Sequence, residues 1–458
     1  MTGLLSPGDL GRINQITSLA VLCSSTLIAP VLTYVGRGFL EWLDAGLLIH
    51  RLKQFLKIVV VFAILSAVVI WLVQDQVNLV SSVSPVWLFA LVAVYLVAYS
   101  IHTMAISGLN LLGRRLAFVA FGNLAAWAGL GLALFMLRRY GRPEAWLLGT
   151  YLGFVVSSVS FALLMRHLAD SAPSAAASAG RGIPFDFWTL FMFGWPQAVV
   201  FVLWWIQSQS YRFILDRVAD LASVGLFFAI YTTCSSPMQA FESLFNEFYG
   251  PTFYRAIKEQ GREGLARAWN AYASAYVPAV ILFGAFLAGS GMFLVKLLLG
   301  ERFQAAAPII IWPAMTETIR AINSSLFTMG IAKVDMRINL PPIVIGAVTA
   351  PALIYLLAPL NALTGTGIAL FGAGLAVLLI MIPMSYRVLP VAWPVRRIGV
   401  AVALGLPLIV GGNLASSWLP EVTLGTAIVA VSIAGIIMVS IQYLVARKWL
   451  RETYAMVR

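Results

Sequence analysis

Two charged residues lie close together in an otherwise apolar stretch of the chain. Glu317 and Arg320 are three residues apart in the segment 304–326, which Pro308 and Pro313 interrupt. Residues at this spacing share one face of a helix. A charge near the bilayer centre costs at least ~2.5 kcal/mol, so such residues face protein or a water-filled cavity. One interpretation is a mutual ion pair that holds helices together. The other is a guanidinium that binds an anion while the carboxylate orients it.

Four further side chains could bind or titrate. A polar run containing Gln209 ends at Arg212, which either extends to the bilayer surface or contacts a substrate in a cavity. Glu242 is either an ion or proton site or the partner of a basic residue. His102 shares its segment with Tyr95 and Tyr99 and is either a hydrogen-bonded core residue or a substrate ligand.

The composition indicates that these residues are surrounded by a membrane. Hydrophobic residues make up 61% of the 458 residues, charged residues only 10%, and the mean hydropathy is +0.91. Soluble proteins carry roughly 25% charged residues. A helix needs about 20 apolar residues to cross a bilayer, and blocks of that length predict a polytopic all-α protein. The thirteen expected spans cover residues 14–36, 57–74, 86–107, 116–137, 145–165, 187–211, 221–246, 272–295, 304–326, 338–358, 362–384, 398–418 and 422–446.

The formal charge of +12 reflects membrane topology and not a nucleic-acid partner. Most of the 30 Lys and Arg residues fall in alternate loops, which are the inner loops if the N-terminus is outside. The positive-inside rule therefore predicts an outer N-terminus and a cytoplasmic C-terminus. Arg138, Arg139 and Arg142 depart from the rule locally.

Two stretches of the chain share a polar stripe and a glycine spacing. One follows Gly11 and the other follows Gly225, and in both a second glycine comes 25 residues later, at Gly36 and Gly250. Each stretch places polar side chains three and four positions apart, which makes one helix face polar. This repetition predicts two related lobes. The stripes contain Asn14, Thr17, Ser18, Ser24 and Ser25 in the first stretch and Thr232, Ser235, Ser236, Gln239, Glu242, Ser243 and Asn246 in the second.

The predicted organisation has four parts. Residues 1–168 form an N-terminal lobe of about five spans, and residues 169–182, rich in Ala, Ser, Gly and Pro, form a cytoplasmic linker. Residues 183–386 form a C-terminal lobe of about six spans. Residues 387–458 add two peripheral spans and a cytoplasmic tail.

The sequence lacks the usual signs of catalysis. The outer loops are all short, and there is no P-loop, no Gly-x-Ser-x-Gly elbow and no paired acidic DxD motif. Cys23 and Cys234 lie inside predicted spans, and the three histidines have no nearby cysteine, so neither a disulfide nor a metal site is expected. We therefore expect a protein that is not an enzyme and needs no cofactor.

Five short motifs follow one another along nearly the whole chain. They are Leu5-Ser6-Pro7-Gly8-Asp9-Leu10-Gly11-Arg12, the polar run before Arg212, Val224-Gly225-Leu226-x-x-Ala229-x-Tyr231, Pro251-x-Phe253-Tyr254 and Leu299-Gly300-Glu301-Arg302-Phe303. In this order they resemble the polysaccharide flippases, the Wzx-type members of the multidrug/oligosaccharidyl-lipid/polysaccharide exporter superfamily. Relatives have a helix before the turn at Gly11, so this chain is expected to be one span short, and they often carry an acid where it has Tyr211.

The resemblance implies two pseudo-symmetric lobes around a central cavity in the bacterial inner membrane. It implies alternating access and transport of a polyprenyl-diphosphate-linked oligosaccharide to the outer leaflet, for exopolysaccharide, capsule or O-antigen synthesis. Membrane lipid, the lipid-linked substrate and other polysaccharide assembly proteins are the implied partners. We expect Arg320 and Arg212 to contact the diphosphate, because arginine binds phosphate through a planar pair of donors. Glu317, Gln209 and His102 complete the expected substrate site, and Glu242 is the candidate ion or proton site.

Two alternatives remain open. A cation-coupled drug exporter of the same superfamily would have a more acidic and aromatic cavity. A membrane-embedded glycan polymerase or acyl transferase belongs to a different class, and the short outer loops argue against it.

Overall fold

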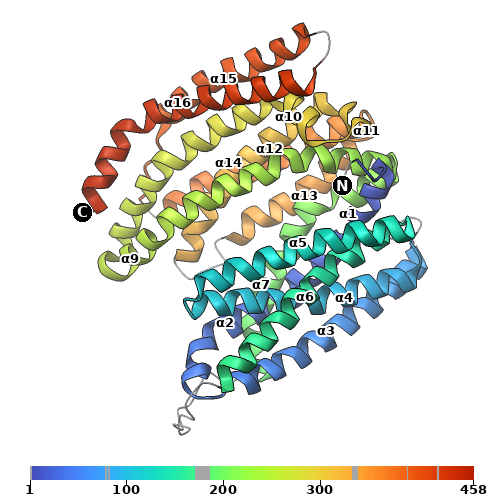
Figure 1. Ribbon diagram of the computed structural model, residues 1–458. Coiled ribbons are helices and arrows are strands. Elements are labelled where there is room, and N and C mark those ends of the chain that lie inside the picture. Colours follow the sequence, from blue (N-terminus) through green and yellow to red (C-terminus); the bar gives the residue numbers. More distant parts are fainter. Residues whose placement is uncertain are drawn as a thin grey trace. The chain divides into compact units, whose positions relative to one another are not determined.

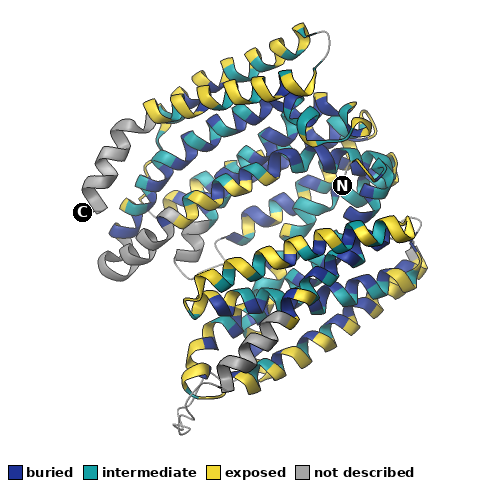
Figure 2. Cartoon of the chain, in the orientation of Figure 1, coloured by how far each residue is buried: buried dark blue, intermediate teal, exposed yellow. Residues whose placement is uncertain are grey.

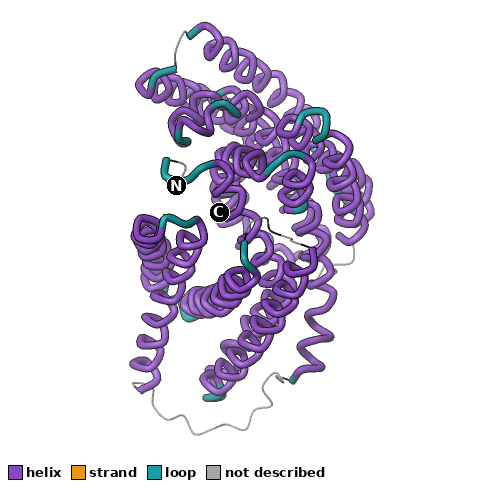
Figure 3. The backbone as a smooth tube through the Cα atoms, turned by 90° about the vertical axis from the view of Figure 1, so that its right-hand side faces the viewer, coloured by secondary structure: helices purple, strands orange, loops and turns teal. Residues whose placement is uncertain are grey.

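The chain is all-α, as predicted, and most of its described residues lie in long helices (Figures 1 and 3). The computed structural model describes residues 3–77, 80, 83–170, 186–332, 339–388, 390–419 and 422–457. Of the predicted linker, residues 171–182 lie outside these ranges.

The chain forms two compact units. We call residues 12–205 the N-unit, and residues 1–11 together with 206–458 the C-unit. Residues 187–205 thus pack with the N-unit, whereas the predicted C-terminal lobe begins at residue 183. The predicted division into lobes, with its pseudo-symmetry, stays a prediction.

The N-unit contains most of seven α-helices and one π-helical turn. Ser84 begins one of these helices by accepting a hydrogen bond from the Trp87 backbone N–H at 3.4 Å, and Pro85 occupies the first turn. The elements are α1 (Pro7–Cys23), η1 (Ser24–Ile28), α2 (Ala29–Asp44), α3 (Leu48–Val77), α4 (Pro85–Leu111), α5 (Arg115–Tyr140), α6 (Pro143–Asp170) and α7 (Phe187–Gln209), of which α1 begins and α7 ends in the C-unit.

Small residues allow α5 and α6 to pack closely. A Cβ atom on Gly153 would lie 2.4 Å from the Cα atom of Gly129, and one on Gly149 would lie 2.5 Å from the Cα atom of Ala133. Helices in membranes associate through such small residues because the backbones must approach each other to make contact. This packing positions the opposite face of α6 against α4.

The C-unit is built around one long helix. This helix, α9, contains two of the predicted spans, as Leu221–Glu247 and Glu263–Gly289, and the described core of the C-unit lies along it. The elements are α8 (Tyr211–Val218), α9 (Leu221–Gly289), α10 (Gly291–Leu298), α11 (Glu301–Gln304), η2 (Ala307–Ile310), α12 (Ile311–Ala332), α13 (Leu340–Leu357), α14 (Ala362–Val388), α15 (Val395–Trp418) and α16 (Leu424–Val457).

The first turns of α1 and α9 are in unusually close contact. A Cβ atom on Gly225 would lie 1.8 Å from the Pro7 carbonyl oxygen, and one on Gly11 would lie 2.2 Å from the Leu221 carbonyl oxygen. The predicted glycine repeat therefore has a packing reason at Gly11 and Gly225. Gly36, in contrast, has open space where its Cβ atom would be.

The described part of the chain contains 11 helical stretches that are long and apolar enough to cross a membrane. The two remaining predicted spans, residues 145–165 and 304–326, coincide with α6 and with η2 and α12. Apolar residues on α3, α15 and α16 are exposed, as lipid-facing helices require (Figure 2). The chain is a multi-pass membrane protein.

Candidate functional site

The polar centre of the C-unit begins on α12. Pro308 lies in the short η2 turn, and Pro313 lies in the first turn of α12, where a missing backbone N–H leaves no helical bond unmade. The two prolines therefore mark the start of α12. Glu317 and Arg320 follow one and two turns later on the same face, as the sequence predicts.

Arg320 lies between two carboxylates. Its Nε atom donates to Glu317 Oε2 at 2.8 Å, and its Nη2 atom donates to Glu242 Oε2 at 3.0 Å. The Glu317 side chain is 1% exposed and that of Glu242 is 10% exposed, whereas that of Arg320 is 32% exposed. The guanidinium is thus the accessible member of a group whose two anions are buried.

Tyr231 completes this group, which we call the Arg320 cluster. Its hydroxyl donates to Glu317 Oε1, so both oxygens of this buried carboxylate have partners. Tyr231 and Glu242 share one face of α9, because eleven residues make slightly more than three full turns. The cluster therefore joins α9 to α12 through side chains from one face of each helix.

Bonds to the α12 backbone fix the position of the cluster. The Tyr276 hydroxyl donates to the Ala321 carbonyl at 3.2 Å, and Trp269 Nε1 donates to the Ser325 carbonyl at 3.2 Å. Both halves of α9 thus contact α12: the first half through the Arg320 cluster, and the second half through these two hydrogen bonds. A buried polar group that is satisfied in this way holds one conformation.

Glu242 differs from its neighbours in the predicted polar stripe. Ser236, Gln239 and Ser243 are exposed, whereas Glu242 and Ser235 are buried. Of the two interpretations given to Glu242, the pairing with a basic residue is present, and its partner is Arg320.

Arg212 is positioned by aromatic rings. Its guanidinium carbon lies 5.4 Å from the Tyr211 ring centre and 5.5 Å from the Phe228 ring centre, and its Nε atom donates to the Tyr211 hydroxyl at 3.3 Å. The Tyr211 ring packs near Tyr231 of the Arg320 cluster, with centres 6.4 Å apart. Cation–π contacts of this kind stabilise an arginine in an apolar environment.

Gln209 ends α7 beside Arg212. Its Nε2 atom donates to Ser208 Oγ at 3.3 Å, and its Oε1 atom is buried with no hydrogen-bond partner among the described residues. Arg320, Glu317, Glu242, Arg212 and Gln209 thus all belong to the C-unit.

His102 belongs to the N-unit. Its Nδ1 atom lies 3.0 Å from Ser157 Oγ, and its ring is half-buried beside Phe154, with ring centres 5.1 Å apart. The ring is thus hydrogen-bonded, as the core interpretation of His102 requires. Its predicted contact with a substrate stays a prediction.

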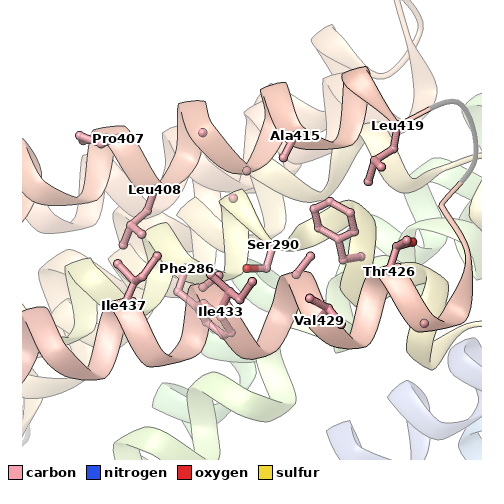
Figure 4. Close-up of a pocket in the computed structure, with 17 residues that line it drawn as sticks. Phe286, Ser290, Pro407, Leu408, Ala415, Leu419, Thr426, Val429, Ile433 and Ile437 are labelled. Carbon is pink, nitrogen blue, oxygen red and sulfur yellow. The ribbon is translucent and has the colours of Figure 1, made fainter.

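An apolar cavity lies elsewhere in the C-unit. It has a volume of about 620 Å³ and lies among the end of α9, α10, α15 and α16 (Figure 4). Among its lining residues, Ser290 and Thr426 are the only ones with a hydroxyl group, and no lining residue is charged. We therefore place the chemistry at the Arg320 cluster and not in this cavity.

The comparisons with known proteins identify a shared fold. The chain is similar to the solved structure of lipid II flippase MurJ in an inward closed conformation, with TM-score 0.63, 10% identity, and 97% of this chain and 94% of that chain covered. It is similar to an inward-facing multidrug resistance MATE family transporter of the MOP superfamily, with TM-score 0.59, 13% identity, and 84% of this chain and 92% of that chain covered. It is also similar to the eukaryotic MATE transporter AtDTX14, with TM-score 0.51, 14% identity, and 87% of this chain and 88% of that chain covered.

No protein-family model matches the chain, and no curated protein matches it. The similar solved structures nevertheless show that the protein has the fold of flippases and exporters of this superfamily.

Proposed function

We propose that the protein is a flippase of this superfamily that moves a polyprenyl-diphosphate-linked oligosaccharide across the bacterial inner membrane. Transport proceeds by alternating access of two lobes around a central cavity, with the N-terminus outside and the C-terminus in the cytoplasm. The product serves the synthesis of a surface polysaccharide. The observation that carries the proposal is the partly exposed guanidinium of Arg320, held between two buried carboxylates.

The bonding of Arg320 leaves donors for an anion. A guanidinium has five N–H donors, and the bonds to Glu317 and Glu242 use one on Nε and one on Nη2. Both carboxylates fix the plane of the group in advance of binding. A diphosphate is a compact anion that accepts paired N–H donors, so an oriented arginine favours it.

The charge of the cluster requires a further step. Two carboxylates and one guanidinium give a formal charge of −1, which opposes an anionic substrate. Glu242 is the carboxylate that can most readily release Arg320, because it is the more exposed of the two and makes a single bond in the cluster. This assigns Glu242 the role of an ion or proton site that is linked to substrate binding.

The same negative charge favours a second candidate, a cation-coupled drug exporter. Two of the structural neighbours carry MATE transporter descriptions. Such a protein would use the excess carboxylate for a cation and would have no need of a free guanidinium donor.

The experiment replaces the whole cluster by neutral residues of similar size. The triple variant Glu242→Gln, Glu317→Gln and Arg320→Met leaves no buried charge unpaired, so it should reach normal membrane levels. We expect this variant to lose surface-polysaccharide export in cells that depend on the protein. The Arg320→Lys variant, which keeps the positive charge and both carboxylates but loses the planar pair of donors, is the matched control and should retain part of the export.

The outcomes distinguish the candidates. Normal export by the triple variant would exclude Arg320 from the substrate site. A protein that restores drug tolerance but no polysaccharide export to a deletion strain would be the cation-coupled exporter.

A further inference from the structure

We propose that a half-buried aromatic face of the N-unit binds the sugar part of the lipid-linked substrate. This face consists of Tyr99 and His102 on α4 and Phe154 on α6, and we call it the aromatic face. The inference rests on the proposed function, because it names the part of the substrate that the N-unit contacts.

The aromatic face is one continuous group of rings. Tyr99 stacks on the buried Tyr95 with centres 5.0 Å apart and an angle of 8° between the ring planes. Phe154 lies edge-on to Tyr99 at 5.5 Å and packs against His102 at 5.1 Å. Tyr99, His102 and Phe154 are each half-buried, whereas Tyr95 and Tyr151 beneath them are buried. The buried tyrosines hold the outer rings in place.

This face has the wrong chemistry for lipid contact. On α6, the buried Tyr151 and Ser157 lie three residues before and three residues after Phe154, so they flank it on the same side of the helix. Polar and charged side chains within spans face protein or water and not hydrocarbon. The neighbouring α5, in contrast, exposes large apolar side chains such as Phe135, as a lipid-facing helix does.

The hydrogen bonds at Ser157 determine which nitrogen of His102 carries a proton. Ser157 Oγ donates its one proton to the Phe121 carbonyl at 3.2 Å, so the contact with His102 at 3.0 Å requires Nδ1 to be the donor. Nε2 of the neutral ring is then an acceptor. The described residues provide no hydrogen bond to it.

These features match a carbohydrate. A pyranose ring has apolar C–H faces that stack on aromatic rings and hydroxyl groups that donate to an acceptor such as imidazole Nε2. Tyr99 and Phe154 provide the stacking surface, and His102 provides the acceptor beside it. Neither feature serves a bare diphosphate, which has no apolar face and, when ionised, no proton to donate. The aromatic face thus separates sugar recognition from the phosphate recognition proposed for Arg320.

The test compares two probes with the full-length protein in lipid nanodiscs. One probe is the lipid-linked oligosaccharide that accumulates when the gene is deleted, and the other is polyprenyl diphosphate without sugar. We expect the native protein to bind the glycosylated probe more tightly. Tyr99→Leu and Phe154→Leu keep apolar volume but remove the ring, and each should weaken binding of the glycosylated probe on the order of fivefold while leaving the sugar-free probe unaffected.

Two further variants separate recognition from folding. His102→Asn keeps a donor near Ser157 but removes the Nε2 acceptor, so it should also weaken only the glycosylated probe. Phe135→Leu is the matched control, because it removes an exposed ring from α5 of the same unit, and it should change neither affinity.

The results overturn the inference or the proposed function separately. Equal affinity of the native protein for both probes, or equal loss for both probes in the Tyr99 and Phe154 variants, would overturn the aromatic face as a sugar site. Failure of the native protein to bind either probe would overturn the proposed function itself.

Discussion

The two units carry different polar chemistry on similar frameworks of apolar helices. The C-unit has a compact charged group, in which one arginine bonds two buried carboxylates. Among the described residues of the N-unit, Arg12 pairs with Glu144, and the aromatic face consists of rings and neutral polar groups. The Arg320 cluster is thus held together by charges, whereas the aromatic face is held together by ring packing and neutral hydrogen bonds.

This difference indicates a division of tasks. Buried charges need partners of opposite sign, so the Arg320 cluster can change its bonding only if another anion or a proton replaces a carboxylate. The aromatic face has no such constraint, because stacking and neutral hydrogen bonds can form without rearranging charges. The Arg320 cluster therefore suits an anionic group, and the aromatic face suits a sugar.

The largest effect on stability is expected from removing one member of the Arg320 cluster. Arg320→Met leaves Glu317 and Glu242 next to each other without a cation, and Glu317 is almost fully buried. We expect a destabilisation of about 3 kcal/mol, measured by unfolding of the purified protein in detergent. Adding Glu242→Gln and Glu317→Gln should recover most of this loss. A single variant as stable as the native protein would show that the cluster holds no essential buried charge.

The next effect concerns the contact between the first turns of α1 and α9. Gly225→Ala would place a methyl group 1.8 Å from the Pro7 carbonyl oxygen, a backbone atom that cannot move alone. We expect a loss of about 1–3 kcal/mol from overpacking, measured by the same unfolding assay. Gly36→Ala is the matched control from the same glycine repeat. It should be neutral or slightly stabilising, because its Cβ atom meets open space and alanine favours a helix.

Local spacing predicted the parts of the fold and site that depend on one helix. The apolar blocks predicted the spans, and the spacing of Glu317 and Arg320 predicted their shared face and their pairing. Glu242 and Tyr231 were not assigned to this site, because they lie on α9, and no local rule states which distant helix packs on α12. Their spacing in the sequence predicts a shared face on α9, but it does not predict that this face packs against α12.

The glycine repeat shows the same limit. Of the three glycines of the repeat whose surroundings the structure describes, Gly11 and Gly225 make a close contact, each with the helix of the other, whereas those of Gly250 lie outside the description. At Gly36 the glycine meets no neighbour, so its place in the pattern has no packing cause in the described structure. Periodicity alone does not distinguish a residue that contacts a neighbour from one that does not.

A smaller effect is expected for the ion pair of the N-unit. Arg12 and Glu144 are 3.3 Å apart with side chains 22% and 11% exposed, and one bond joins them. Arg12→Met should cost about 2 kcal/mol, less than Arg320→Met, because it leaves one carboxylate without a cation and not two. A double-mutant cycle with Glu144→Gln measures the coupling directly. A coupling as large as that between Arg320 and Glu317 would remove the contrast between the two units.

The smallest effect is expected at the start of α7, outside the membrane-spanning part. Asp186 accepts hydrogen bonds from the Thr189 backbone N–H at 3.0 Å and from the Thr189 hydroxyl at 2.7 Å. These bonds lower the pKa of the Asp186 carboxyl below its ordinary value. Because the folded pKa lies below the unfolded value of about 3.9, the charged form stabilises the folded protein above that pH. This stabilisation is lost as the pH falls through the folded pKa.

Asp186→Asn tests this by keeping the cap but removing its titration. The native protein should be the more stable of the two near pH 6, and the difference should shrink as the pH is lowered past 3.9 towards 3, measured by thermal unfolding in detergent. Thr189→Val removes the hydroxyl bond and should reduce the difference at pH 6 while leaving the backbone bond in place. A difference between the native protein and Asp186→Asn that stays constant across this pH range would mean that the two bonds to Thr189 do not favour the charged carboxylate.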